Sequence, residues 1–265
     1  MSEATRRSET ALADAPEVST EREAFQRDGF VIVRGLFDEG EIARISAWTD
    51  ELERLPEVPG RAMKYFEPSL LRPDDRVLQR IENFCPFHAG FAELCESDKL
   101  RGSVARLFGE PAVLFKDKIN FKLPGGGGFK PHQDQQAGWG TYADLFITAM
   151  LSIDATTTEN GCLELCAGHH TRGLIGQEWT PLTDDDMRRL GAQPVPTRPG
   201  DAVFFDSYTP HASAPNLTAE RRRLLYITYN RRSAGDHRAR YFADKRKSFP
   251  PDIERDPSRT YTFRV

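Results

Sequence analysis

Hydrophobic and polar positions follow two different periods along this chain of 265 residues. In the first part, apolar residues recur at helical spacing, most clearly in IARISAWTDELERL, which predicts an amphipathic helix. The residues expected on its buried face are Ile42, Ile45, Trp48, Leu52 and Leu55. After Pro111, short apolar runs separated by Gly, Pro, Asn and Thr take over, which is typical of strands. These runs are AVLFKDKINFKL, DLFITAMLSID, GCLELC, DAVFFD and RLLYITYN.

The order of these patterns predicts the architecture. Helical segments followed by strands favour a β-sandwich or barrel with supporting helices, so we expect a mainly β fold with flanking helices. We expect a flexible tail over residues 1–20 and one domain over residues 21–265. Within that domain we expect helical support at 21–110, a β core at 111–232 and a C-terminal extension of coil at 233–265.

Local signals place the first elements. Thr20 and Glu23 have the spacing of a capping box, which predicts a helix starting at Thr20 and ending at Gly29. The run FVIVRG then predicts a short buried strand. Asp38 and Glu41 repeat the helix-start signal before the amphipathic segment.

Three other segments are less regular. Residues 56–73 predict a surface loop, with a lid over a site as the alternative. Residues 99–108 predict a helix that stops at Gly109. Residues 171–198 form a polar insertion between strands, with a short helix expected at 184–190.

Composition narrows the classes of function. The formal charge is -4 and the isoelectric point is near 5.9, which argues against a nucleic-acid partner. No apolar stretch is long enough to span a membrane and the N-terminus lacks a signal peptide, so we expect a cytoplasmic protein. The four cysteines fit neither a disulfide framework nor a zinc motif, and we interpret them as reduced core residues. The oligomeric state cannot be read from the sequence.

One predicted strand has a polar face. Alternation in AVLFKDKINFKL places Phe115, Asp117, Ile119 and Phe121 on one side. The other side then carries Lys116, Lys118, Asn120 and Lys122. If this polar side points into the barrel, its cations approach the cavity.

The segment FKPHQDQQAGWG carries the first candidate chemistry. In an extended chain residues i and i+2 point to the same side, so His132 and Asp134 present an imidazole and a carboxylate together. The alternative for such a pair is a structural hydrogen bond. His211, 79 residues later, is a candidate third ligand once the intervening strands return the chain. Two histidines and one carboxylate with open positions suit a non-haem Fe(II) oxygenase.

Residues after His211 extend this interpretation. Ser213 follows two residues on and Arg222 leads into the last apolar strand. Arginine forms bidentate, charge-assisted pairs with carboxylates, so a guanidinium and a hydroxyl near an open iron site suit a dicarboxylate chelator. Together these parts suggest 2-oxoglutarate. Arg221 and Arg223 are alternatives to Arg222 by a slip of register.

The sequence resembles the phytanoyl-CoA dioxygenase family of Fe(II)/2-oxoglutarate-dependent oxygenases over nearly its whole length. The resemblance rests on DGFVIVRGLF, PHQD, ENGCLELCAGHH, RPGDAVFFDSYTPHASAPN and RRRLLYITYN. It implies a double-stranded β-helix, or jelly roll, with His132, Asp134 and His211 as iron ligands. It also implies that Arg222 and Ser213 hold the C5 carboxylate of 2-oxoglutarate.

The resemblance further implies a hydroxylase that consumes 2-oxoglutarate and O2 and releases succinate and CO2. Halogenases of this type replace the carboxylate ligand with a small residue, so the presence of Asp134 favours hydroxylation. The stretch KINFK resembles the ectoine hydroxylase branch, which makes Asn120 and Lys122 further candidates for co-substrate binding.

The substrate is less defined than the chemistry. Spare cations at Lys116 and Lys118 suggest a small anionic metabolite, and the family's aminoalkylphosphonate hydroxylases are the best match. Gln135, Trp139 and Tyr142 are the other candidate substrate contacts, the aromatic residues as walls around an amino group. One alternative is the same chemistry on a natural-product or acyl-carrier-bound intermediate. The alternative of another class is a non-catalytic metal-binding module or a zinc hydrolase.

Overall fold

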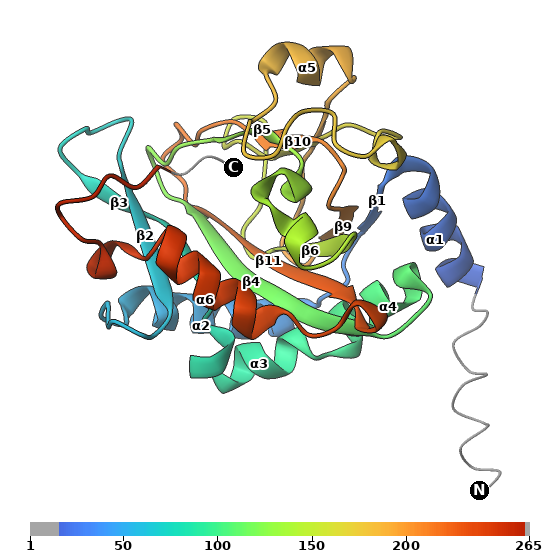
Figure 1. The fold of residues 1–265 in the computed structure, drawn as a ribbon, viewed down its shortest axis with the longest axis horizontal. Helices are drawn as coiled ribbons and strands as arrows, with labels where there is room; N and C mark the ends of the chain where they lie inside the picture. The colour runs from blue at the N-terminus through green and yellow to red at the C-terminus, as the bar shows by residue number, and fades with distance from the viewer. Residues whose placement is uncertain (1–15, 263–265) are drawn as a thin grey trace, which may run out of the picture.

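Two antiparallel sheets face each other at the centre of the molecule, and helices cover the outer face of the larger one (Figure 1). The computed structural model describes residues 16–262, without the side chains of residues 16–19. The larger sheet has the order β1-β9-β6-β11-β4-β3-β2 and the smaller one β5-β10-β7-β8. This is the mainly β, jelly-roll arrangement with flanking helices that the sequence predicts.

The strands of the larger sheet are β1 (Phe30–Val33), β2 (Met63–Pro68), β3 (Arg76–Glu82), β4 (Ala112–Lys122), β6 (Phe146–Ser152), β9 (Ala202–Asp206) and β11 (Arg222–Arg231). Those of the smaller sheet are β5 (Phe129–His132), β7 (Leu163–Leu165), β8 (Gln193–Val195) and β10 (His211–Ser213). The α-helices are α1 (Pro16–Asp28), α2 (Glu39–Arg54), α3 (Ala89–Cys95), α4 (Ser103–Phe108), α5 (Asp184–Arg189) and α6 (Arg238–Ser248). Within residues 16–262, no helix is long and apolar enough to cross a lipid bilayer.

The local signals for α1 and α2 are largely confirmed. Asp38 and Glu41 form a reciprocal capping box, each side chain accepting from the other's backbone N–H at 2.8 Å. Helix α1 ends at Asp28, and Gly29 follows at φ 81°, a left-handed conformation that glycine adopts without strain. Leu55 was expected in the core, but it lies beyond the end of α2 and is 44% exposed.

Two predictions for the N-terminal half are wrong. Helix α1 begins at Pro16 rather than Thr20, so residues 16–20 are helical, and the rest of the expected tail lies outside the described residues. Residues 63–68 form β2 rather than a loop, and β3 pairs with it. A register shift at Tyr65 and Phe66 hides the alternation expected of a strand. The region 21–110 therefore contributes three strands besides its helices.

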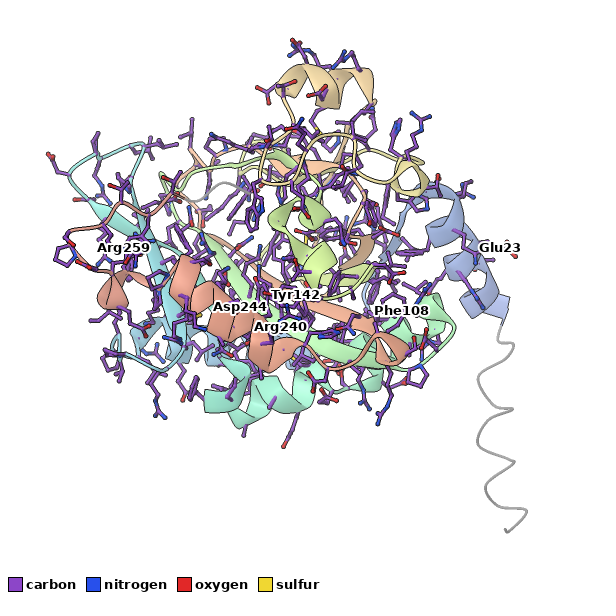
Figure 2. The ribbon with its side chains drawn as sticks, viewed as in Figure 1. Glu23, Phe108, Tyr142, Arg240, Asp244 and Arg259 are labelled. Carbon is purple, nitrogen blue, oxygen red and sulfur yellow. The ribbon has the colours of Figure 1, made fainter. Side chains whose placement is uncertain are left out.

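The C-terminal extension is also more regular than predicted. Residues 238–248 form α6 instead of coil, because contacts with distant strands hold this polar segment. Arg238 forms an ion pair with the buried Asp117 of β4 at 2.5 Å. Lys245 forms one with the buried Glu82 of β3, also at 2.5 Å. On the other side of the helix, Asp244 lies beside Tyr142 (Figure 2).

The polar face of β4 points to the inside of the fold, as predicted. Lys116, Lys118 and Asn120 line an internal cavity, while Ile119 and Phe121 pack under the helices. Phe115 was expected with Ile119, but it packs with Trp139 and Tyr241 in a separate cluster. The pairing with β11 skips a residue at this point, because Thr228 is opposite Lys116 and Tyr229 opposite Leu114. The bulge turns Phe115 away from the helical side.

Substitution of Asp117 tests whether the buried ion pairs hold α6 in place. Its carboxylate accepts the backbone N–H groups of Phe84 and Cys85 at 2.7 and 2.9 Å and pairs with Arg238. Removing it leaves two buried backbone donors without their acceptor and a half-buried guanidinium without its counter-charge. We expect Asp117→Ala to lower the free energy of unfolding by about 3–5 kcal/mol in urea denaturation.

The matched control is Glu96→Gln, which removes the exposed pair with Arg101. Exposed pairs contribute little, so we expect a change of less than about 1 kcal/mol. Equal losses in the two variants would contradict the anchoring role of Asp117.

Candidate active site

His132, Asp134 and His211 meet between two neighbouring strands of the smaller sheet. His132 ends β5, and His211 begins β10 directly opposite it in the antiparallel register. Gln133 is extended at φ -106° and ψ 135°, so Asp134 returns to the side of His132 before a 3₁₀ turn begins. The Asp134 Oδ1 lies 3.7 Å from His132 Nε2 and 3.9 Å from His211 Nε2. One ligand atom from each residue lies within 4.8 Å of the others.

Backbone carbonyls orient both imidazoles. The Nδ1 of His132 lies 2.6 Å from the Lys130 carbonyl oxygen, and the Nδ1 of His211 lies 2.9 Å from that of Thr209. A carbonyl only accepts, so each Nδ1 carries the hydrogen and each Nε2 keeps its lone pair toward the centre. Thr148 Oγ1 donates to Asp134 Oδ2 at 3.4 Å, which steadies the carboxylate.

The environment sets the ionic forms of Asp134 and His211. Burial alone would raise the pKa of Asp134, but its interactions with the two imidazoles and with Lys118 hold this pKa well below its usual range. Burial, with the repulsion of His132, lowers the pKa of His211 to about 4. At neutral pH this gives a carboxylate and a neutral imidazole, the forms that bind metal ions. The donor set and the Nε2 directions therefore fit Fe(II).

A second polar group lies at the Ser213 end of the cavity. Arg222 of β11 and Lys122 of β4 are opposite each other, and each is only 1% exposed. Lys122 Nζ donates to Ser213 Oγ at 2.8 Å, and Arg222 donates to the Gly161 carbonyl through Nη2 at 2.6 Å. No carboxylate among residues 16–262 forms an ion pair with either, and Arg222 Nη1 has no hydrogen-bond partner there.

Two buried cations without a counter-charge are costly, and burial, with the repulsion of Arg222, lowers the pKa of Lys122 to about 6. A bound anion removes this cost and favours the ammonium form of Lys122. The unsatisfied Nη1 of Arg222 and Lys122 together fit one carboxylate of a dicarboxylate such as 2-oxoglutarate. The neighbouring arginines are engaged elsewhere. Arg223 pairs with Asp154, and the exposed Arg221 lies against Asp50.

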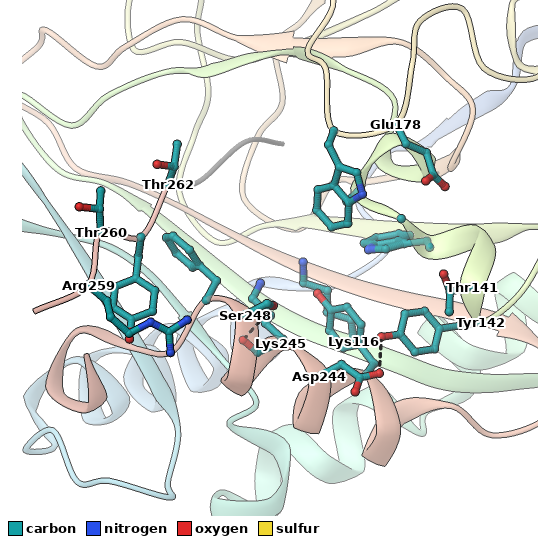
Figure 3. Close-up of a pocket in the computed structure, with 17 residues that line it drawn as sticks. Lys116, Thr141, Tyr142, Glu178, Asp244, Lys245, Ser248, Arg259, Thr260 and Thr262 are labelled. Atoms are coloured by element: carbon teal, nitrogen blue, oxygen red, sulfur yellow. Dashed lines mark hydrogen bonds between the residues drawn. The ribbon is translucent and has the colours of Figure 1, made fainter. Parts of the chain in front are cut away.

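Two cavities that share lining residues lie at and beside the site. The inner one is lined by the metal-site residues together with Lys118, Asn120 and Ser213. The outer one, about 570 Å³, lies between α6 and the turns after Asp134 (Figure 3). Lys116 and Trp139 line both cavities, so they stand at the junction.

The structure brings most predicted substrate contacts to these cavities. Tyr142 lines the outer one, but Gln135 lines neither, because its buried side chain donates to the Ala143 carbonyl at 3.1 Å. Sequence reasoning missed Tyr226 and Thr228, which line the inner cavity. The sequence does contain a signal for them. Tyr226 and Thr228 lie an even number of residues after Arg222 in the predicted strand, so they share its face.

Comparison with known proteins places the chain in a family. Residues 25–224 match the model of phytanoyl-CoA dioxygenase (PhyH). The chain is 42% identical to 2-aminoethylphosphonate dioxygenase of the uncultured bacterium HF130_AEPn_1, over 89% of this chain and 90% of that protein. It is 40% identical to methylphosphonate hydroxylase of Gimesia maris, over 85% of each chain.

A solved structure shows the same fold. EctD from S. alaskensis with 2-oxoglutarate and 5-hydroxyectoine aligns with a TM-score of 0.69 at 20% identity, covering 84% of this chain and 78% of that chain. The chain therefore belongs to the phytanoyl-CoA dioxygenase family and is an iron(II)- and 2-oxoglutarate-dependent dioxygenase.

Proposed function

We propose that this enzyme hydroxylates a C–H bond of an aminoalkylphosphonate. The observation that carries the proposal is the presence of two lysines, Lys116 and Lys118, in the cavity that holds the metal-site residues. Neither forms an ion pair with a carboxylate within residues 16–262, so both are available to an anionic substrate. The similarity to a 2-aminoethylphosphonate dioxygenase and a methylphosphonate hydroxylase supports a phosphonate as that anion.

In this proposal each polar group has a separate task. The Nε2 atoms of His132 and His211 and the carboxylate of Asp134 hold the iron. Arg222, with Lys122 and Ser213, binds the C5 carboxylate of 2-oxoglutarate. Asn120 lines the same cavity, and in this proposal its side-chain amide donates an N–H to the co-substrate.

The protein's contribution to the reaction is positioning and exclusion of water. When bound, the iron and 2-oxoglutarate supply the oxidising chemistry that inserts oxygen from O2 into a C–H bond, with release of succinate and CO2. Lys116 and Lys118 fix the anionic group of the substrate and so determine which carbon lies nearest the metal site. Phe205 and Leu163 supply apolar parts of the inner cavity's wall.

Arg222 provides the test of co-substrate binding. We expect Arg222→Met to raise the KM for 2-oxoglutarate about 100-fold, because a charge-assisted pair at a buried site is lost. Anaerobic addition of Fe(II) and then 2-oxoglutarate should give a visible charge-transfer band in the unchanged protein. The band should weaken in the variant, while Fe(II) binding itself persists.

Arg221→Met is the matched control, since this neighbouring side chain is exposed and pairs with Asp50. It should leave the KM for 2-oxoglutarate within about twofold of the unchanged protein. A band of equal strength in the Arg222 variant at limiting 2-oxoglutarate would overturn the assignment of this arginine.

Substitution of Lys116 and Lys118 tests the proposed substrate class. Purified enzyme should release succinate in step with consumption of 2-aminoethylphosphonate. Lys116→Met and Lys118→Met should each lower kcat/KM for this substrate by about 10-fold or more, through loss of a charge-assisted contact.

Lys247→Met serves as a control for these substitutions, because Lys247 is exposed on the same helix that walls the outer cavity. Its effect on kcat/KM should stay within about twofold. If no phosphonate stimulates succinate release, while 2-oxoglutarate still gives the charge-transfer band, the substrate proposal is wrong and the reaction class stands.

A further inference from the structure

Asp244 stands out among the residues of the outer cavity. It is a carboxylate on α6, beyond the end of the family match at residue 224, and the phosphonate-binding role proposed above does not use it. Tyr142 donates its hydroxyl to Asp244 Oδ2 at 2.9 Å. Figure 3 shows these two residues joined on one side of the cavity, with Glu178 on the opposite side.

The position of Asp244 is set by a rigid helix. The adjacent Lys245 is tied to the buried Glu82, and Arg238 at the start of α6 is tied to the buried Asp117. Tyr241 lies between these anchors and packs against Phe115 at 4.5 Å between ring centroids. Because both ends of α6 are fixed to β3 and β4, the carboxylate has a defined place relative to the metal site.

Asp244 also keeps capacity to bind a cation. Its Oδ1 accepts no hydrogen bond from the described residues. The Arg240 guanidinium lies 3.7 Å from Oδ2, but the Arg240 and Asp244 side chains are 57% and 46% exposed in the present structure, and exposed pairs of this kind are weak. Burial, with the hydrogen bond to Asp244, raises the pKa of Tyr142 to about 12. The phenol therefore stays protonated and directs the carboxylate at neutral pH.

Aromatic rings line the same corner of the cavity. Tyr142 and Tyr241 meet edge to face at 5.7 Å, and Trp139 lies next to Tyr241 at 6.4 Å. These rings already accept an ammonium group within the protein, because Lys116 Nζ lies 5.3 Å from the Trp139 ring and 5.6 Å from the Tyr241 ring. A carboxylate beside aromatic rings is an environment that favours a positively charged nitrogen.

The lysines and Asp244 line different parts of the two cavities. Lys118 lines the inner cavity, Lys116 lines both, and Asp244 lines the outer one. We propose that Asp244, held by Tyr142, binds the ammonium group of a zwitterionic aminophosphonate and selects it over phosphonates without a positive charge. This inference rests on the proposed function and assigns the opposite end of the same substrate.

Paired substrates separate binding of the ammonium group from every other role. The comparison uses 2-aminoethylphosphonate and n-propylphosphonate, in which a methyl group replaces the ammonium group at nearly the same size. For Asp244→Asn we expect kcat/KM for 2-aminoethylphosphonate to fall about 10-fold, mainly through KM. The value for n-propylphosphonate should stay within about twofold.

Two further variants complete the design. Tyr142→Phe removes the hydrogen bond that directs Asp244. It should lower kcat/KM for 2-aminoethylphosphonate by less than Asp244→Asn does, and should again affect 2-aminoethylphosphonate more than n-propylphosphonate. Glu178→Gln removes the carboxylate on the opposite side and should leave both substrates within about twofold. Succinate release measures all of these rates.

The outcomes distinguish the two proposals. If Asp244→Asn slows both substrates equally, or neither, the selectivity role is overturned while the phosphonate assignment remains. If the unchanged enzyme consumes neither phosphonate, the proposed function has failed, and the role of Asp244 fails with it.

Discussion

The pairing of β4 with β11 is the interaction on which the rest of this structure depends. The two strands run antiparallel from Arg222 opposite Lys122 to Arg231 opposite Ala112. One face of the pair supports the hydrophobic core under the helices, and the other face lines the cavity beside the metal site. Because side chains alternate, a slip of one residue would turn the cationic face into the core. The core therefore enforces the register that the active site needs.

Buried charges in this protein fall into two groups with different consequences. Glu82 and Asp117 are paired with Lys245 and Arg238, and these contacts fasten α6 to the sheet. Lys122 and Arg222 are buried and Lys118 is half-buried near the metal site, and none of the three has an ion-pair partner among residues 16–262. A protein tolerates an uncompensated buried cation only when stability elsewhere offsets it. The unpaired group is where we place the anionic ligands, and the paired group is structural.

Helix α6 links stability with selectivity. Ion pairs hold it to two strands, and Asp244, next to the ion-paired Lys245, lines the larger cavity. The smaller sheet and its metal-site residues serve the chemistry of the reaction. Part of the wall of the outer cavity comes from α6, a segment outside the family match, so the same chemistry can be combined with a different substrate preference.

Short-range patterns in the sequence determined the mainly β fold, the capping box of α2 and the polar face of β4. They also singled out His132 and Asp134, because spacing in an extended chain defines which side chains share a side, whereas the place of His211 beside them depends on the pairing of β10 with β5. Tertiary structure alone decided what depends on contacts between distant segments. The bulge opposite Thr228 redirected Phe115, pairing with β3 made a strand of residues 63–68, and ion pairs to Asp117 and Glu82 made a helix of the polar C-terminal segment. Those contacts join residues far apart in the chain, and local periodicity carries no information about them.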